Sequence, residues 1–182
     1  MTRILDILLA LCGFILLSPV FLVVWIIVHF EVKQAIFSQT RVGLNRKPFT
    51  LYKFRTMDID TDSMASHLIP STKITKSGKF LRRAKLDELP QLWNILVGDM
   101  SLVGPRPCLE TQTKLLKLRD SHNIFDVLPG LTGLAQISKV DMSDPELLTK
   151  LDFEMVKNFS TITYLKYIVL TIFGRGIGDA VK

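Results

Sequence analysis

Two adjacent carboxylates, Asp87 and Glu88, follow the most basic part of the chain. The segment from Lys73 to Lys85 contains six lysines and arginines and no acid. In such a field a carboxylate stays ionised and can approach a phosphate group. The carboxylate and the phosphate would repel each other by about 4 kcal/mol at roughly 4 Å and an effective dielectric of ~20. Cations or a divalent metal must therefore offset this repulsion. The pattern predicts chemistry on a phosphate.

Asp87 also has a purely structural interpretation. It stands where a helix cap belongs, just before the apolar segment Gln91–Val97, with Pro90 in the first turn and Gly98 after the last. Because successive residues of a helix point about 100° apart, Asp87 and Glu88 are expected to have distinct roles rather than to share a proton. Composition and spacing leave the cap and the catalytic role both open.

Three further cations have positions that suit a diphosphate. Pro105 and Pro107 fix the backbone on both sides of Arg106, which favours bidentate contact with phosphate; the alternative is a surface polyproline turn. Alternation along the strand expected at residues 49–57 puts Lys53 and Arg55 on one face. That face is interpreted either as a diphosphate grip or as a solvated strand surface.

The elements that must hold these residues are short. Residues 36–57 are typical of a β-hairpin with a turn at Gly43-Leu44-Asn45, and 58–72 read as an acidic loop without a calcium-loop pattern. A polar helix is expected at 108–126, and a loop at 128–136 leads into a short apolar segment. The apolar segment 164–173 is too short to span a bilayer and is expected at the membrane surface or in the core.

The first thirty residues contain a run from Ile7 to Val28 without a charge. As a helix it would be about 33 Å long, close to the thickness of a bilayer core. A signal peptide is disfavoured because the run is too long and no cleavage pattern follows. Ser18-Pro19 at its centre favours a bend, so that the chain dips into one leaflet and returns. Periodicity does not decide between a spanning and a re-entrant helix.

The net charge of +6 belongs to the part after this run, because only Arg3 and Asp6 precede it and they cancel. Such a surplus suits an anionic partner: a phospholipid surface, a nucleotide or a nucleic acid. Cys12 lies in the apolar run and leaves Cys108 without a plausible disulfide partner, which favours a reducing, cytoplasmic setting. The basic residues just after the run agree with this orientation.

Six motifs in series resemble the bacterial sugar transferases, the monotopic phosphoglycosyl transferase family. They cover nearly the whole chain in order: Ser18-Pro19, Tyr52–Met57, Gly78–Arg82, Leu86–Gln91, Gly98–Pro107 and Pro129–Gln136. The resemblance implies an α/β, mostly helical fold. It comprises a re-entrant membrane helix at residues 1–33, broken at Ser18-Pro19, and a small catalytic domain at 34–182 with interfacial amphipathic helices and a short β-hairpin.

The implied reaction moves a sugar-1-phosphate from a UDP-sugar to polyprenyl (undecaprenyl) phosphate and releases UMP. Asp87 would be the nucleophile, and Glu88 would assist by metal contact or proton handling. Both would be ligands of a Mg²⁺ ion that neutralises the diphosphate. The residues expected to bind substrate are Lys53, Arg55, Arg82, Pro105, Arg106, Pro107 and Gln136.

The implied location is the bacterial inner (cytoplasmic) membrane, with the catalytic domain on its cytoplasmic face. A homodimer is left open. The chain departs from the family pattern at Leu128, at Ser138-Lys139-Val140 and at Tyr164, in segments expected to touch the nucleotide or the sugar. The competing function is a non-catalytic basic membrane-surface protein, an inactive homologue. A nucleic-acid binder is disfavoured because the basic segment lacks interleaved stacking aromatics.

Overall fold

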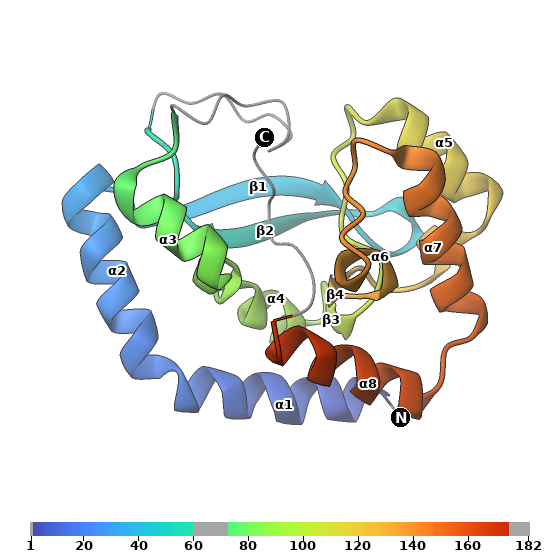
Figure 1. Cartoon of the computed structure of the whole chain (residues 1–182), viewed down its shortest axis with the longest axis horizontal. Helices are drawn as coiled ribbons and strands as arrows, with labels where there is room; N and C mark the ends of the chain where they lie inside the picture. The colour runs from blue at the N-terminus through green and yellow to red at the C-terminus, as the bar shows by residue number, and fades with distance from the viewer. Residues whose placement is uncertain (1, 60–72, 175–182) are drawn as a thin grey trace.

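The computed structural model describes residues 2–59 and 73–174, and Figure 1 shows their helices arranged around two small sheets. The helices are α1 (Thr2–Leu16), α2 (Ser18–Val32), α3 (Lys76–Ala84), α4 (Gln91–Val97), α5 (Thr113–Ser121), α6 (Leu134–Ile137), α7 (Pro145–Lys157) and α8 (Thr161–Ile172). Three 3₁₀ turns and four strands complete the described chain: η1 (Leu44–Arg46), η4 (Leu86–Glu88), η5 (Ile124–Asp126), β1 (Ile36–Val42), β2 (Pro48–Phe54), β3 (Ser101–Val103) and β4 (Gly130–Thr132). This mostly helical architecture is compatible with the expected α/β class.

The expected hairpin is present. β1 and β2 pair antiparallel from Ile36 opposite Phe54 to Val42 opposite Pro48, and η1 forms the connection. Asn45 has a left-handed backbone with a φ of 51°, a conformation that asparagine tolerates better than most residues. The second strand ends at Phe54, three residues before the expected end. Most of the acidic loop expected at 58–72 lies outside the described residues.

The sequence reading missed a second sheet. β3 and β4 are three-residue parallel strands, with Ser101 opposite Gly130 and Val103 opposite Thr132. The chain comes very close to itself here: a Cβ on Gly130 would lie 1.9 Å from the backbone nitrogen of Gly104. Gly130 is therefore required for the contact between the loop after β3 and the start of β4.

The other expected helices are found with changed bounds. The apolar helix α4 spans Gln91–Val97 as expected, and Gly98 ends it in a left-handed conformation with a φ of 102°. The polar helix expected at 108–126 is shorter, because only α5 and the turn η5 form within that range. The apolar segment at 164–173 belongs to α8, which begins earlier, at a Ser160 capping box.

The apolar run at the N-terminus folds as two helices, α1 and α2, and the chain bends by 63° at the break between them. Proline has no N–H, so Pro19 leaves the carbonyl of Ile15 without its helical donor. The Ser18 hydroxyl donates to this carbonyl at 2.8 Å, which satisfies it at the break. Within residues 2–59 and 73–174 no single helix is long and apolar enough to cross a bilayer; α1 and α2 meet that requirement only as a bent pair.

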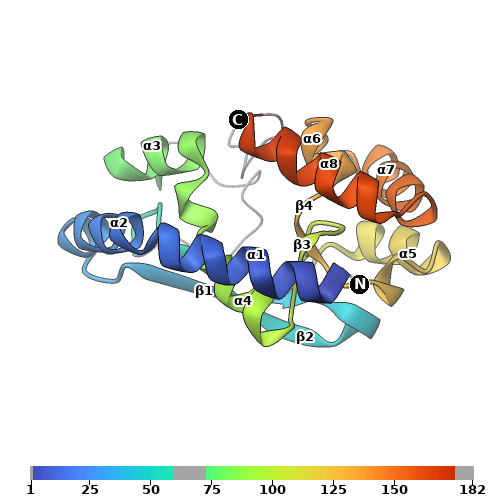
Figure 2. The same ribbon diagram turned by 90° about the horizontal axis from the view of Figure 1, so that it is seen from below.

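The N-terminal end of α1 is docked on the rest of the molecule. Arg3 donates to the carbonyls of Ile95 at 2.6 Å and Leu96 at 3.0 Å, at the end of α4. Asp6, only 2% exposed, accepts hydrogen bonds from the Ser101 hydroxyl, the Leu102 N–H and the Tyr164 hydroxyl. Asp6 therefore joins α1 to the free side of β3 and to α8, which lie along the same side of the molecule in Figures 1 and 2.

The C-terminal end of α2 is attached as well. The Glu31 carboxylate accepts hydrogen bonds from the backbone N–H of Lys76 at 3.1 Å and from the hydroxyl of Ser77, in the first turn of α3. A carboxylate at a helix N-terminus satisfies free amides and opposes the helix dipole. Ala10, fully buried, packs with Leu92 and Ile95 of α4 in one hydrophobic core. Both ends and the middle of the bent pair are thus in contact with the remainder of the chain.

Three helices, α1, α2 and α8, leave large apolar side chains uncovered. On α1 and α8 a set of the exposed residues follows helical spacing, while Tyr164 and Tyr167 occupy the buried face of α8. The exposed apolar residues include Ile4, Leu8, Leu11 and Ile15 on α1, Leu22, Val23, Trp25, Ile26, Ile27 and Phe30 on α2, and Ile162, Leu165, Val169 and Ile172 on α8. Exposed apolar surface of this extent is typical of contact with a membrane or with another protein.

Candidate functional site

Glu88 lies at the centre of a buried group of charges. Its Oε1 atom forms an ion pair with Arg106 Nη2 and lies 3.7 Å from Lys53 Nζ. Glu88 and Lys53 are both buried, and Arg106 is partly buried. Lys53 comes from the hairpin, Glu88 from η4 and Arg106 from the loop after β3, so three separate segments converge here. The solvated strand face considered for Lys53 is therefore wrong.

The 3₁₀ turn η4 holds both carboxylates. Lys85 ends α3 in a left-handed conformation with a φ of 57°, and its carbonyl accepts the Glu88 N–H, which closes the turn. Asp87 is 1% exposed. The N-cap of α4 is Pro90, and α4 has no side-chain cap. Asp87 therefore does not stand at the N-cap position of α4 that was considered for it.

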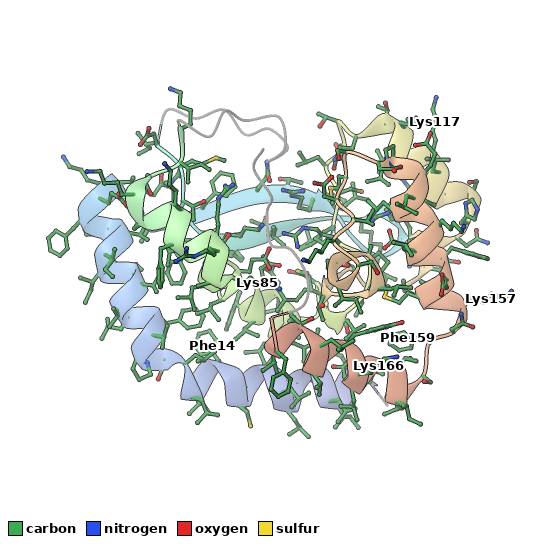
Figure 3. All side chains as sticks on the ribbon, in the orientation of Figure 1. Phe14, Lys85, Lys117, Lys157, Phe159 and Lys166 are labelled. Atoms are coloured by element: carbon green, nitrogen blue, oxygen red, sulfur yellow. The ribbon has the colours of Figure 1, made fainter. Side chains whose placement is uncertain are left out.

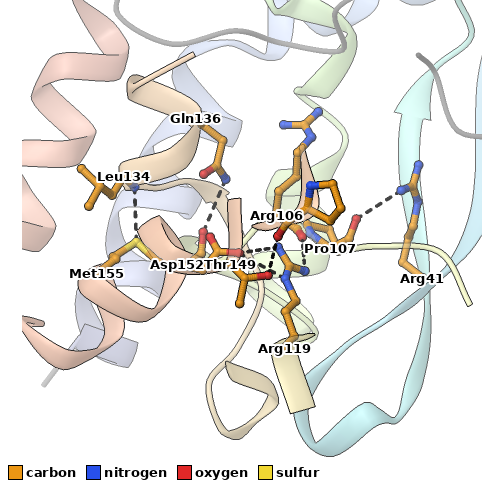
Figure 4. Close-up of polar contacts among 11 residues, drawn as sticks. Arg41, Arg106, Pro107, Arg119, Leu134, Gln136, Thr149, Asp152 and Met155 are labelled. Carbon is orange, nitrogen blue, oxygen red and sulfur yellow. Dashed lines mark hydrogen bonds and ion pairs between the residues drawn. The ribbon is translucent and has the colours of Figure 1, made fainter. Parts of the chain in front are cut away.

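The Pro105-Arg106-Pro107 loop is held from three directions. The carbonyls of these three residues accept hydrogen bonds from Gly130 N–H at 2.9 Å, Arg119 Nη1 at 2.8 Å and Arg41 Nη1 at 3.1 Å, respectively. Figure 4 shows the two arginines reaching the loop from different sides, Arg119 from below and Arg41 from the right. Pro105 and Pro107 are buried, so the alternative of a surface polyproline turn is wrong. The expected stiff presentation of Arg106 is present.

A cavity of about 260 Å³ adjoins Glu88. Lys85, Glu88 and Leu89 line one side, and Thr132, Gln136 and Thr171 are among the residues that line the rest. Figure 3 shows Lys85 near the middle of the molecule, between α3 and α6. Burial lowers the pKa of Lys85, with the nearby Arg106 charge acting in the same direction and Glu88 opposing it. Asp87 is next to Glu88 in sequence but does not line the cavity.

Gln136 reaches the cavity from α6. Its side chain is buried, its Nε2 lies 3.4 Å from the Gly104 carbonyl, and its Oε1 has no hydrogen-bond partner among the described residues. A buried amide oxygen without a donor loses free energy, so this atom is ready to accept a hydrogen bond from a ligand. The sequence reading placed Gln136 in the site and missed Thr132 and Thr171, whose hydroxyls lie 2.5 Å apart at the cavity wall.

The two remaining predicted cations have different surroundings. Arg82 lies on α3, one turn before Lys85; its Nε donates to the Thr56 hydroxyl, and its buried Nη1 has no hydrogen-bond partner among the described residues. Arg55 Nη2 donates to Gln34, and its guanidinium lies over the Phe37 ring. Lys53 and Arg55, expected side by side, thus have separate partners, because the strand ends between them at Phe54.

The three departures from the family pattern lie away from this cavity. Tyr164 is buried, donates to Asp6 and belongs to the core. Val140 packs in the cluster that contains Cys108 and Leu148. Leu128 lines a second, mostly apolar cavity beside α1. The expectation that these positions contact the nucleotide or the sugar has no support from their contacts.

The residues fit a magnesium ion only as a partial ligand set. Within residues 2–59 and 73–174 no three His, Cys, Asp or Glu side chains gather at one point. Mg²⁺ commonly uses one or two carboxylates together with substrate phosphates, and Asp87 with Glu88 meets that minimum. The ion pairs with Lys53 and Arg106 both use Glu88 Oε1, so Glu88 would hold such an ion through its other carboxylate oxygen. The donor set fits a metal that arrives with a phosphorylated substrate.

Buried carboxylates next to converging cations, and a cavity lined by both polar and apolar side chains, indicate a site for anionic substrates with an apolar part. The chain belongs to the bacterial sugar transferase family, whose model matches residues 1–175. This match includes both the bent helix pair and the site.

Curated relatives agree with this membership. The chain is 44% identical over 136 residues to EpsL of Bacillus subtilis, named as an uncharacterised sugar transferase, a match that covers 75% of this chain and 67% of EpsL. It is 35% identical to a UDP-glucose:undecaprenyl-phosphate glucose-1-phosphate transferase of Escherichia coli (96% of this chain, 40% of the relative). It is 33% identical to an undecaprenyl-phosphate galactose phosphotransferase of Salmonella typhimurium (87% and 37%). The match thus covers less than half of the length of each of these last two relatives.

Proposed function

We propose that this protein transfers a sugar-1-phosphate from a UDP-sugar to polyprenyl (undecaprenyl) phosphate and releases UMP. The observation that carries the proposal is the buried Asp87-Glu88 pair, with Lys53 and Arg106 on Glu88, beside a cavity. Relatives named for sugar-phosphate transfer to undecaprenyl phosphate support the reaction class. The product would be the lipid-linked first intermediate of glycoconjugate or polysaccharide assembly.

Asp87 is the proposed nucleophile. One of its carboxylate oxygens attacks the β-phosphorus of the UDP-sugar, the bond from that phosphorus to the bridging oxygen breaks, and UMP leaves with the bonding electrons. The enzyme then carries an aspartyl phospho-sugar. A phosphate oxygen of the polyprenyl carrier attacks the same phosphorus, the Asp87–phosphorus bond breaks, and the carboxylate is restored. Because Asp87 does not line the cavity, substrate binding must turn it towards the cavity.

The cations have complementary roles. Arg106, held rigidly between two prolines, presents a planar fork to the diphosphate, and Lys53 adds a second charge. The Arg82 Nη1 group offers a further donor. Glu88 holds Lys53 and Arg106 together before substrate arrives. Its ion pairs with both cations weaken as the phosphates bind. Gln136 Oε1 and the hydroxyls of Thr132 and Thr171 would bind polar groups of the sugar or nucleotide.

Asp87 and Glu88 are also the proposed ligands of Mg²⁺, which would neutralise charge on the diphosphate. Removal of divalent metal with EDTA should stop UMP release, and added Mg²⁺ should restore it. Calcium serves as the matched control and should restore less activity than Mg²⁺, because it is larger and accepts less regular coordination. Full activity after exhaustive chelation would overturn the metal assignment.

The decisive experiment measures UMP release from a panel of UDP-sugars by the purified full chain, with and without polyprenyl phosphate. With UDP-sugar alone, the expected result is a burst of up to about one UMP per enzyme and a matching adduct in the intact mass. Addition of polyprenyl phosphate should then give continuous turnover. The alternative, an inactive homologue that binds anionic lipid, predicts membrane binding with no UMP from any sugar.

We also propose that α1 and α2 form a re-entrant anchor in the inner membrane, with the catalytic domain on its cytoplasmic face. Arg3 and Asp6 bind α4, β3 and α8, and Glu31 binds α3, so both ends of the pair contact the same domain. A spanning helix would have to break one set of these contacts and carry its charged end across the bilayer. The exposed apolar faces of α1 and α8 would lie against the lipid.

Cysteine labelling tests this topology. In a chain without Cys12 and Cys108, Thr2→Cys should be protected from a membrane-impermeant reagent in intact cells and should react after permeabilisation. Lys117→Cys, on the exposed surface of α5, is the matched control and should behave identically. In the Pro19→Ala variant, a fraction of molecules should expose position 2 to the periplasm because the break is removed. Periplasmic labelling of Thr2→Cys in the chain that keeps Pro19 would contradict a re-entrant anchor.

A further inference from the structure

Behind the Pro105-Arg106-Pro107 loop lies a buried ion pair to which no role in the reaction has been given above. Arg119 of α5 is 2% exposed and Asp152 of α7 is fully buried. Arg119 Nε and Nη2 donate to Asp152 Oδ2 at 3.1 and 2.6 Å. Burial alone would lower the pKa of the Arg119 guanidinium, but the charge and hydrogen bonds of Asp152 raise it. Burial raises the pKa of the Asp152 carboxyl, and the charge and hydrogen bonds of Arg119 oppose this shift. The two hydrogen bonds to Asp152 Oδ2 fix the orientation of the guanidinium.

The third nitrogen of the Arg119 guanidinium, Nη1, faces the loop. Nη1 donates to the backbone carbonyl of Arg106 at 2.8 Å, and the side chain of this same Arg106 forms the ion pair with Glu88. Figure 4 shows this arrangement, with Arg119 between Asp152 and the loop. Neither Arg119 nor Arg106 lines the candidate cavity, but the Arg106 side chain pairs with Glu88, which does. An effect of Arg119 on bound substrate is therefore expected to pass through Arg106.

We propose that Arg119 and Asp152 are positioning residues that set the direction in which Arg106 meets the diphosphate. The proposal rests on the proposed function for its catalytic consequence. Prolines on both sides stiffen the loop but provide no N–H groups that could anchor it, so its orientation depends on donors to its carbonyls. Asp152 occupies two nitrogens of Arg119 and thereby fixes the direction of the third. This buried pair costs desolvation, which is consistent with a role in specifying geometry rather than in adding stability.

Arg119→Lys separates a role in positioning the loop from a role in adding stability. Lysine keeps a positive charge beside Asp152, but a single ammonium lacks the planar fork needed to serve Asp152 and the Arg106 carbonyl together. Because small displacements of a positioning group can cost up to about 100-fold, we expect UMP release to fall roughly 10- to 100-fold, mainly in kcat. Arg46→Lys is the matched control: Arg46 also pairs with an aspartate, Asp120, but on the exposed surface, and activity should not change.

A double-mutant cycle identifies the route of the effect. If Arg119 acts through Arg106, then Arg119→Lys should cost little in a chain that already carries Arg106→Lys. If the fold-losses of the two single variants multiply in the double variant, the proposal is overturned. A loss of activity that only follows the folded fraction, judged by thermal unfolding, would overturn it too. Should Arg119→Lys fail to fold, Asp152→Asn serves as the second variant, since it removes the charge but keeps the shape.

Hydrogen exchange provides a readout that does not depend on the reaction. Backbone amides of residues 104–112 should exchange faster in Arg119→Lys than in wild type or in Arg46→Lys, because the loop loses an anchor. Unchanged exchange in this segment would overturn the positioning role even if activity fell. A wild-type protein without UMP release would instead refute the proposed function, while faster exchange in Arg119→Lys would still support the loop anchor.

Discussion

Asp87→Asn is expected to abolish sugar-phosphate transfer and to remove the covalent adduct from the intact mass. The amide has almost the same volume as the carboxylate, so the buried η4 turn should keep its packing, but a neutral amide does not attack phosphorus. We expect UMP release to fall by at least about 1,000-fold, which corresponds to roughly 4 kcal/mol in the barrier. The burst of UMP and the adduct are measured with UDP-sugar alone, before polyprenyl phosphate is added.

The control for this change is Asp126→Asn, at an exposed aspartate of η5, which should leave both the burst and the turnover intact. Thermal unfolding of Asp87→Asn should be close to that of the wild type. Two results would refute the nucleophile: an adduct of the same mass on Asp87→Asn, or UMP release in the wild type that strictly requires polyprenyl phosphate. The latter would indicate direct displacement.

The second large effect is expected for Glu88→Gln. The change removes the anion that faces both Lys53 and Arg106 in a buried setting, so the repulsion between the two cations is less well compensated. Loss of one partner from a buried ion pair typically costs about 3–5 kcal/mol. We expect a lower melting temperature and at least a 100-fold slower transfer. Since Asp87 is retained, the adduct should still form slowly when UDP-sugar is in excess.

Glu146→Gln provides the comparison. Glu146 also pairs with a lysine, Lys114, but both side chains are exposed, and such pairs contribute little to stability. Melting temperature and transfer should both stay at the wild-type level in this variant. If Glu88→Gln behaves like Glu146→Gln, the charge cluster around Glu88 has no part in the reaction.

Local signals in the sequence predicted much of the fold. The hairpin follows from alternation and a turn, α4 from an apolar run between Pro90 and Gly98, and the bend from Pro19. In each case the information lies within a few neighbouring residues. The sequence singles out Lys53, Arg106 and Gln136 for the same reason, because each belongs to a short motif that matches a family pattern. Their contact with substrate stays a prediction.

Contacts between distant segments were not predictable in this way. β3 and β4 are three residues long and pair in parallel, so neither carries a periodic pattern of its own. The sequence shows Asp6 only as a charge before the apolar run, because nothing around it indicates its three buried donors, which lie 95, 96 and 158 positions away. The alternation rule failed for Arg55 because β2 ends one residue earlier. These outcomes depend on tertiary packing, which overrides local preference.

The bond between Asp6 and Tyr164 also sets an order of events during biosynthesis. The two residues are 158 positions apart, so the ribosome makes the carboxylate long before its hydroxyl partner. Until α8 is complete, Asp6 adjoins an apolar segment without this donor, and an ionised carboxylate is costly to bury in lipid. The contacts that dock α1 on the rest of the molecule are therefore complete only once α8 has been made.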